Sequence, residues 1–398
     1  RRHTRYIGDW SSDVCSSDLI VNFQAREFLK VSDTSQNFSK PEPPIAFALP
    51  LLFCPLLILA WIYGGIILIL APVFGYVIIS IIDFIIGENK KNQIDVSNDT
   101  SSYKLILFAW PFIQFFLLFG SLVSICWFNH LTTFEAICLM LVQGMITGAV
   151  GITFAHELMH QKTKLERFFS DILMAMAFYG HFRTEHVFVH HRYVGTKKDA
   201  VTARFNESFY TFFLRVIPQC LISAWSVEAQ KLASKNKSIL NISNPFYIYA
   251  ALACFFVFLS FVVGGAWGIA LFFIQALVAV LHLEVVNYIE HYGLSRKKIS
   301  DNKYEPTKPH HSWNANHAAS NLLLINLQKH SDHHSRPSQT YPTLSAHDAD
   351  SAPQLPFGYP IMVVFSLVPF IWRKVMNPKV IKWRAQFYPE VSEWKGLS

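Results

Sequence analysis

The sequence predicts an all-α, polytopic membrane protein in which six transmembrane helices carry a histidine-rich cap. Three observations indicate this fold class. Hydrophobic residues make up 52% of the 398 residues and charged residues only 15%, whereas about a quarter of the residues in soluble domains are charged. Six apolar runs have roughly the 20 residues that a spanning helix needs. Nine histidines gather in four short clusters at one end of those runs.

The first residues differ in character from everything that follows. Residues 9–19 read DWSSDVCSSDL, which is similar to the translation of a short-read sequencing adapter. We therefore interpret residues 1–19 as a non-native, adapter-derived segment and leave them out of the fold prediction. Residues 20–44 are predicted to form a cytoplasmic N-terminal segment.

The six apolar runs define a predicted membrane domain, residues 45–291. They cover residues 45–63, 65–86, 105–128, 134–155, 245–264 and 267–288. The turns that join them into three hairpins contain no Lys or Arg, whereas the N-terminal segment, the loop after the second run, loop 156–244 and the C-terminal segment 292–398 are basic. Because Lys and Arg concentrate in cytoplasmic loops, both termini are predicted to face the cytoplasm.

Three other apolar stretches are too short or too polar to count as spans. Residues 168–182 end in Gly-His. Residues 209–225 contain Arg215, and residues 357–372 are interrupted by two prolines. We expect all three to lie at the membrane interface or against the cap. Glu284, near the end of the sixth run, is expected to face the interior of the bundle because a charge is costly in lipid.

The clustered histidines lie in the motifs HELMH, EHVFVHH, NYIEHYG and LQKHSDHH. They are His156, His160, His186, His190, His191, His291, His330, His333 and His334. Residues three or four apart on a helix share one face, so each close pair can present two imidazoles to one ion. Imidazole is the commonest protein metal ligand, and nine exceed the needs of one ion. The sequence therefore predicts two metal ions on the cytoplasmic side.

The ligand type narrows the choice of metal. Imidazole donors suit iron, copper, zinc or nickel, and the lack of thiolates argues against an iron–sulfur cluster or structural zinc. A ferritin-like site needs two Glu-x-x-His pairs, of which only Glu157 with His160 is a strong candidate. Zinc hydrolysis needs only three ligands and a base. A redox-active pair of iron ions explains the pattern best.

Four carboxylates accompany the histidines. Since a metal-bound imidazole usually donates its other N–H to a carboxylate, carbonyl or water, these side chains are expected to hold the ligand rings; they are Glu157, Glu185, Glu290 and Asp332. Salt bridges to Arg183, Arg192 or Lys329 are the alternative. His3, His130 and His347 fit surface positions, while His310 and His311 are assigned either to the surroundings of the site or to the surface. The six cysteines form no C-x-x-C pair and are expected to be buried hydrophobes.

These motifs resemble the integral-membrane alkane 1-monooxygenases and the related xylene monooxygenase hydroxylase subunits. The stretch HSWNANHAASNLLLINLQKHSDHH and the later LPFGYP also match, and the order of motifs agrees over most of the chain after residue 40. NYIEHYG together with LQKHSDHH is the most specific part, because membrane fatty-acid desaturases share three histidine boxes but not NYIEHYG. His317 also matches a family position but stays outside the predicted ligand set.

The resemblance implies a di-iron oxygenase with a catalytic cap on the cytoplasmic side of a bacterial inner membrane. It implies that the nine histidines bind iron, that O₂ is activated, and that a terminal C–H bond of a hydrocarbon such as an n-alkane becomes an alcohol. It also implies electrons from rubredoxin or a ferredoxin through a reductase. This chain has no rubredoxin-like cysteine motif, so the donor is expected to be a separate protein.

Two departures leave the substrate open. Val189 stands where the family usually has Gly before the His pair, and VGTKKDAVTAR replaces a run similar to Pro-Glu-Asp-Pro. These favour a divergent branch nearer the xylene type. A xylene-type methyl hydroxylase and a fatty-acyl desaturase therefore remain alternatives.

A histidine-rich metal transporter is a third alternative, from another class. It would need ionisable residues at mid-membrane, whereas Asp83, His282 and Glu284 lie near cytoplasmic ends. Nucleic-acid binding is disfavoured despite a net charge of +7, because no basic stripe with interleaved aromatic residues is present.

Overall fold

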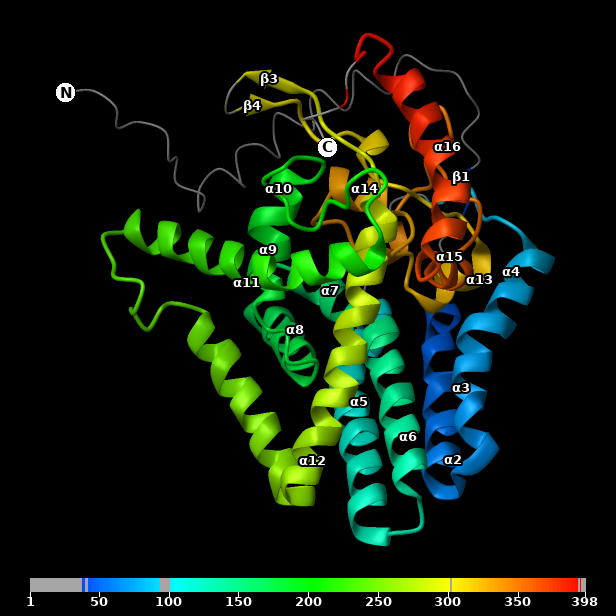
Figure 1. Ribbon diagram of the computed structural model, residues 1–398, viewed down its shortest axis with the longest axis vertical. Coiled ribbons are helices and arrows are strands. Elements are labelled where there is room, and N and C mark those ends of the chain that lie inside the picture. The colour runs from blue at the N-terminus through cyan, green and yellow to red at the C-terminus, as the bar shows by residue number, and fades with distance from the viewer. Residues whose placement is uncertain (1–37, 40–41, 94–100, 301–302, 393, 395–398) are drawn as a thin grey trace.

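Long apolar helices form one end of the molecule in the computed structural model, which describes residues 38–39, 42–93, 101–300, 303–392 and 394 (Figure 1). Five helical segments are long and apolar enough to cross a membrane: Pro44–Tyr63, Gly65–Ile86, Ser101–Phe128, Thr133–Met159 and Phe246–His291. The segment interpreted as adapter-derived, residues 1–19, lies outside the described residues. The prediction of a polytopic helical membrane protein is confirmed.

The longest helix, α12 (Phe246–His291), contains the fifth and sixth predicted spans. Its backbone leaves helical geometry at Gly264 (φ −144°) and at Gly265 (φ 58°), and the second of these angles is one that glycine adopts at little cost. A straight helix of 46 residues would be about 69 Å long, more than twice the ~30 Å of a bilayer core. The two glycines instead fold α12 into a hairpin (Figure 1).

The first four spans are built from several helical pieces. Their bounds are Pro44–Leu52 (3₁₀), α2 Phe53–Tyr63, Gly65–Ile69 (3₁₀), α3 Leu70–Pro72, Val73–Ile78 (π), α4 Ile79–Ile86, α5 Ser101–Phe128, α6 Thr133–Ile146, Thr147–Ile152 (π) and α7 Thr153–Met159. The fourth span thus extends beyond the predicted residue 155 and carries the HELMH motif to the cap. At the opposite end, Glu135 closes a capping box with Thr132 and also accepts a hydrogen bond from the Gly65 amide at 2.8 Å.

Glycines allow the fourth span to approach α12 closely. A Cβ atom on Gly144 would lie 2.5 Å from the carbonyl oxygen of Gln275, and one on Gly148 would lie 2.5 Å from the Cβ of His282. Small residues at such contacts are typical of helix packing in membranes. Large apolar side chains face outward instead, and Phe84 is 90% exposed, as expected for a surface in contact with lipid.

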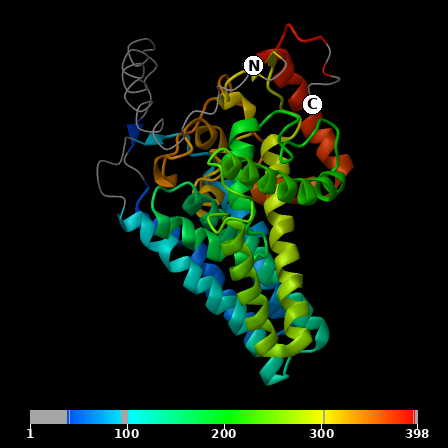
Figure 2. The same ribbon diagram turned by 90° about the vertical axis from the view of Figure 1, so that its left-hand side faces the viewer.

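The cap gathers at the other end, where the molecule widens (Figure 2). Its helices are α8 Lys164–Met176, α9 Phe182–Glu185, α10 His191–Tyr193, α11 Phe209–Ala233, α13 Ala318–Leu323, α14 His330–Ser335, α15 Tyr359–Ser366 and α16 Pro369–Phe387. The sheets are minimal: β1 (Phe38–Ser39) pairs in parallel with β2 (Asn92–Gln93), and β3 (Lys298–Ser300) pairs antiparallel with β4 (Lys303–Tyr304).

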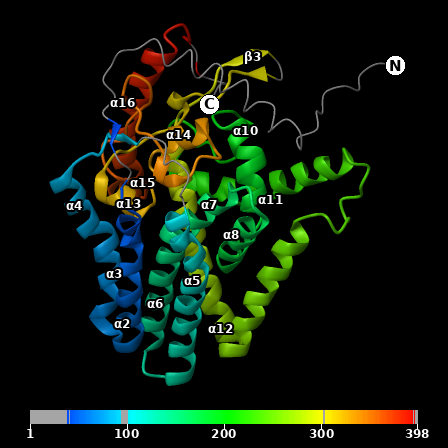
Figure 3. The same ribbon diagram turned by 180° about the vertical axis from the view of Figure 1, so that it is seen from behind.

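The three ambiguous stretches lie in or beside the cap. Helix α8 packs against α7, α5 and α12. Helix α11 runs across the direction of the spans (Figure 3) and leaves Leu214 77% and Ile222 66% exposed, which suits a helix at a membrane surface. Helices α15 and α16 are bent by 119° at their junction, and Trp372 there packs on Tyr288 of α12 with ring centroids 5.1 Å apart.

Candidate metal centre

The nine clustered histidines converge where the spans meet the cap. They come from the end of α7, the π-helical turn His186–His190 with α10, the last residue of α12, and α14. Their ligand atoms form two groups, within each of which the atoms lie within 4.8 Å of one another. The five-histidine group contains His156, His160, His186, His191 and His333, and the four-histidine group contains His190, His291, His330 and His334.

Within each group the rings direct their Nε2 atoms at one another. The distance between the Nε2 atoms is 3.0 Å for His160 and His186, 3.1 Å for His291 and His330, and 2.9 Å for His330 and His334. A neutral imidazole has only one N–H, so hydrogen bonds cannot satisfy four or five converging nitrogens. Nitrogens bound about 2.1 Å from one ion at right angles lie about 3 Å apart. The residues therefore fit two metal ions.

The π-helical turn His186–His190 decides how the histidines are divided between the two groups. The spacing of four residues suggests that His186 and His190 act together, but they belong to different groups. In the wider turn the His191 amide bonds to the His186 carbonyl, five residues back, and this places His191 beside His186. Such turns are frequent at functional sites.

The α-helical pairs keep the expected arrangement. His156 and His160 share the five-histidine group, and His330 and His334 share the four-histidine group. His333 turns from α14 to the five-histidine group. Helix α14 therefore supplies ligand rings to both groups and ties them together.

Burial sets the protonation state of the clustered histidines that lie in the cap. Removal from water lowers the pKa values of these rings well below the usual value, and neighbouring imidazoles lower them further; the rings are His160, His186, His191, His330, His333 and His334. Neutral imidazole is the form that binds a metal ion, so the cap holds these side chains ready for binding.

Glu290 lies at the four-histidine group, whereas Glu157 does not reach a ligand ring. Glu290 Oε2 is 3.3 Å from His330 Nε2, and Glu290 Oε1 accepts a hydrogen bond from the Tyr359 hydroxyl at 2.8 Å. Glu157 Oε1 instead accepts hydrogen bonds from the Gln161 side chain at 2.9 Å and from a backbone amide at 3.2 Å. Glu157 therefore fixes the end of α7 rather than a ring.

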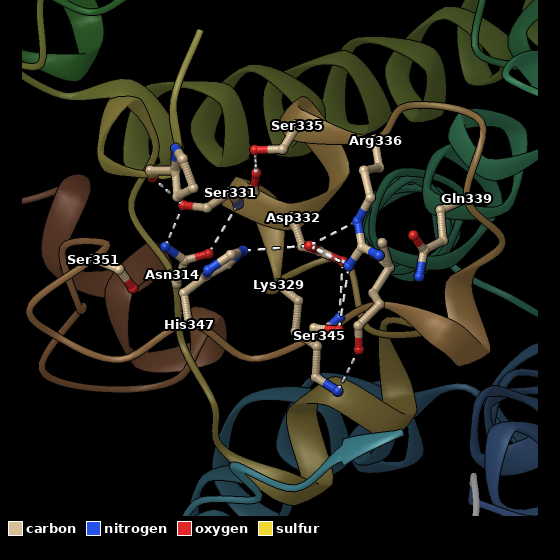
Figure 4. A network of polar contacts seen from close by, with 12 residues as sticks. Asn314, Lys329, Ser331, Asp332, Ser335, Arg336, Gln339, Ser345, His347 and Ser351 are labelled. Carbon is tan, nitrogen blue, oxygen red and sulfur yellow. Dashed lines mark hydrogen bonds and ion pairs between the residues drawn. The ribbon is translucent and has the colours of Figure 1, made fainter. Parts of the chain in front are cut away.

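Asp332 is the centre of a polar network beside α14 (Figure 4). Its carboxylate accepts hydrogen bonds from Arg336 at 2.6 Å and from the Ser345 amide at 2.9 Å, and lies 3.3 Å from His347 Nε2. Lys329 does not pair with it but donates to a backbone carbonyl at 3.0 Å. Asp332 therefore ties α14 to the loop that follows it, and neither the expected ring contact nor the alternative bridge to Lys329 is formed.

Asp199 is the carboxylate that holds a ligand ring, and the sequence analysis did not single it out. Its Oδ2 lies 2.9 Å from His190 Nδ1 and accepts a hydrogen bond from Thr202 at 2.7 Å. Asp199 is the acidic residue of the stretch VGTKKDAVTAR, which stands where the family has an acidic run, and this position was the sequence feature that could have identified it. Glu185 is fully buried, and neither carboxylate oxygen has a hydrogen-bond partner among the described residues; burial, with Asp199 and Glu284 nearby, raises its pKa well above the usual value.

The remaining histidines lie outside the two groups. His130 is exposed and bonds to a backbone carbonyl, His347 contacts Asp332, and His317 precedes α13. His310 and His311 lie with Glu305 in a third cluster. His3 lies outside the described residues. All five described cysteines are free.

A cavity of about 80 Å³ opens beside the two histidine groups. His156, His186 and His330 border it, and the rest of its wall is largely apolar and includes Met145, Ile152, Leu283, Leu323 and Val363. The spans thus offer an apolar guest a position directly beside the predicted metal ions.

Two all-imidazole groups at the end of a bundle of apolar helices define a membrane metalloenzyme of the histidine-box type. Residues 131–366 match the protein family described as Fatty acid desaturase. Within this family the chain belongs to the alkane 1-monooxygenases, which are oxidoreductases.

Curated relatives support this assignment. The chain is 37% identical to Alkane 1-monooxygenase 2 of Pseudomonas aeruginosa over 79% of its own length and 83% of the relative. It is 35% identical to Alkane 1-monooxygenase 1 of Alcanivorax borkumensis over 81% and 79% of the two chains. The xylene/toluene monooxygenase hydroxylase component of Pseudomonas putida is 29% identical over 61% and 64%. The identities therefore do not support the expected proximity to the xylene type.

Proposed function

We propose that this protein is a membrane di-iron monooxygenase that converts medium- or long-chain n-alkanes to 1-alkanols. O₂ is the oxidant, and a separate rubredoxin or ferredoxin with its reductase supplies electrons. One observation carries the proposal. His156, His186 and His330 belong to the histidine groups and also line the apolar cavity. The names of the curated relatives support the choice of substrate.

Two iron ions would be held by the five-histidine and four-histidine groups. When bound, the pair supplies O₂ activation and the oxidising power needed to attack an unactivated C–H bond. The chain's own contribution is to fix the rings. Asp199 accepts the Nδ1–H of His190, so the lone pair of Nε2 faces the other ligands of its group. Glu290, held by Tyr359, places a carboxylate oxygen at the edge of the same group.

Substrate position would be determined by shape, because an alkane offers no hydrogen-bonding group. The cavity presents apolar side chains from several spans, and at one end it is bordered by His156, His186 and His330. A terminal methyl group that reaches this end lies beside the metal ligands, while the remainder of the chain is in contact with apolar side chains. This arrangement favours attack at a chain end.

We place the active site on the cytoplasmic side of a bacterial inner membrane. The cap and the loops rich in Lys and Arg lie at one end of the spans, and the hairpin turns without Lys or Arg lie at the other (Figure 1). By the charge rule for membrane proteins, the basic end faces the cytoplasm.

The test is turnover of a substrate panel by the purified protein in lipid. Reductase, rubredoxin or ferredoxin, and NADH are supplied with octane, hexadecane, p-xylene or a saturated fatty-acyl substrate. We expect 1-alkanols and two iron ions per chain. Benzylic alcohol without alkanol would replace the proposal by a xylene-type activity, and an alkene by a desaturase. Metal uptake into vesicles without O₂ consumption would indicate a transporter.

A further inference from the structure

A third histidine cluster lies outside the two metal groups. The ligand atoms of Glu305, His310 and His311 lie within 4.8 Å of one another. The Tyr388 hydroxyl lies among them, 3.1 Å from His310 Nε2 and 2.6 Å from His311 Nε2. Judged by distances alone, this cluster resembles a third metal site.

The hydrogen bond on the far side of His311 argues against a metal. The Lys308 amide donates to His311 Nδ1 at 2.9 Å. Because Nδ1 accepts this hydrogen bond, it carries no hydrogen itself, so the ring is neutral and carries its single hydrogen on Nε2. That hydrogen points at the Tyr388 oxygen, which leaves no lone pair for an ion. In metal sites the second ring nitrogen donates a hydrogen bond, whereas here it accepts one.

The same tautomer fixes the hydrogen of Tyr388. Since the phenol oxygen accepts from His311, its own O–H donates to Glu305 Oε1, at 2.5 Å. Burial acts to raise the pKa of Glu305, but hydrogen bonds from the Tyr388 hydroxyl and the Lys297 amide, with His311 Nε2 3.6 Å away, outweigh it and hold the pKa well below the usual value. Lys308 Nζ also lies 3.3 Å from Glu305 Oε2. Tyr388 is thus hydrogen-bonded to an ionised carboxylate that can take its proton.

A row of aromatic rings leads from Tyr388 toward the surface. The Tyr388 ring centroid lies 5.2 Å from Trp383 and 5.8 Å from Trp394, and the two indoles are 5.8 Å apart. Tyr388 and Trp383 are buried, whereas Trp394 is half-buried. Rings at these separations support electron transfer in short steps.

The cluster is joined to the four-histidine group through α14. Ser331 follows the ligand His330, and its Oγ lies 2.5 Å from the Pro309 carbonyl oxygen and 3.0 Å from the Ser312 carbonyl oxygen. These residues flank His310 and His311. The Asn314 side chain holds Ser331 from the other side, as Figure 4 shows. A short path of covalent and hydrogen bonds therefore connects the metal ligand to Tyr388.

We propose that Tyr388 is an oxidisable residue that, with Trp383 and Trp394, draws an oxidising equivalent away from the metal centre when no alkane is bound. This inference rests on the proposed function, because the oxidant is the iron pair after its reaction with O₂. The Tyr388 O–H bond breaks, the proton passes to Glu305 Oε1, and the electron passes to the oxidised iron pair. An electron from Trp394 by way of Trp383, with return of the proton, restores Tyr388, and the electron-donor protein reduces Trp394.

The test is electron paramagnetic resonance of the iron-loaded, chemically reduced protein frozen after mixing with O₂ without alkane. We expect a tyrosyl radical whose spectrum changes with ring-deuterated tyrosine and whose yield falls when octane is present. Tyr388→Phe should remove the radical, and Glu305→Gln should lower its yield several-fold. Tyr292→Phe is the matched control, because that hydroxyl is also buried but donates to an amide, Asn377 Oδ1, at 2.7 Å.

Trp394→Phe provides a second readout that does not alter the tyrosine. In this variant the Tyr388 radical should form and persist longer, because the half-buried end of its route to the surface is removed; this comparison stands even where Tyr388→Phe does not fold. A radical unchanged in Tyr388→Phe, one located on Tyr359, or a third metal ion lost in His310→Ala would overturn the inference. A protein that hydroxylates octane but forms no tyrosyl radical in the alkane-free sample would overturn this inference alone, whereas absence of both O₂ uptake and hydroxylation would overturn the proposed function.

Discussion

The paired metal groups and the Glu305–His310–His311 cluster are both buried, histidine-rich and compact, yet they are built for different chemistry. In the histidine groups, Nε2 atoms of different rings face one another at 2.9–3.2 Å, and one N–H per neutral ring cannot satisfy all of these contacts. In the third cluster, Nε2 of both rings faces a phenol oxygen. The difference lies in what the rings point at, not in how closely they are spaced.

The other ring nitrogen shows the same contrast. His190 Nδ1 lies on the Asp199 carboxylate, which accepts a hydrogen and leaves Nε2 free to bind a metal. His311 Nδ1 accepts the Lys308 amide, which forces the hydrogen onto Nε2. In these two rings the partner of Nδ1 therefore determines whether Nε2 carries a lone pair or a hydrogen.

Removal of a ligand ring is expected to have the largest effect. His186→Ala takes one ligand from the five-histidine group, and His330→Ala takes one from the four-histidine group; His156→Ala tests the HELMH motif at the end of α7. Each should abolish NADH-dependent octane hydroxylation, with loss of iron from the altered group. His130→Ala, an exposed histidine outside both groups, is the control for turnover and iron content. Retained turnover in any ligand variant would remove that residue from the ligand set.

Removal of the carboxylate behind a ligand is expected to have the next largest effect. Asp199→Asn takes away the acceptor for His190 Nδ1, and changes of this kind cost about 10–100-fold in metal affinity or activity. Iron titration and octane turnover measure both. Asp171→Asn is the control, because Asp171 is also a buried carboxylate but pairs with Arg183 at 2.6 Å, outside both groups. Equal losses in the two variants would mean that Asp199 acts only through stability.

The sequence was sufficient to predict the spans and the convergence of the nine histidines, because both depend on local patterns. Apolar runs of sufficient length predict spanning helices, and the nine clustered histidines form the two groups that the structure contains. The division of those histidines between the groups was not predictable in the same way. It depends on the π-helical turn His186–His190, and no spacing rule distinguishes that turn from an α-helix.

Hydrogen bonds between residues far apart in the sequence were the second feature that sequence analysis did not predict. Glu157 and Asp332 stand beside ligands in the sequence but bond to segments that fold back from elsewhere, such as the Tyr341 and Ser345 amides. Asp199 stands eight residues after the nearest ligand, His191, and still reaches a ligand ring. Proximity to a clustered histidine in the sequence therefore did not predict which of these carboxylates contacts a histidine ring of the two groups.

A smaller effect on turnover is expected for Tyr359, which contacts the four-histidine group only through Glu290. Tyr359→Phe keeps the wall of the cavity but removes the 2.8 Å hydrogen bond to Glu290. A hydrogen bond of about 1 kcal/mol corresponds to about a fivefold change in rate, and we expect it in kcat rather than in KM for octane. Tyr292→Phe, which loses a bond to an amide instead, should leave kcat near that of the unaltered protein. An effect confined to KM would assign Tyr359 to substrate binding.

The smallest effect is expected at the third cluster. His310 stacks on Phe387 with ring centroids 4.4 Å apart and bonds to Tyr388, so His310→Ala leaves every ligand of the two metal groups in place. Two iron ions per chain should remain, and octane hydroxylation should stay within about twofold, the range of substitutions away from critical contacts. Iron content and the rate of octane hydroxylation, both measured on the His310→Ala protein, test this expectation. Loss of an iron ion here would show that the contrast between the clusters is wrong, because a ring that bonds to a phenol would then also bind metal.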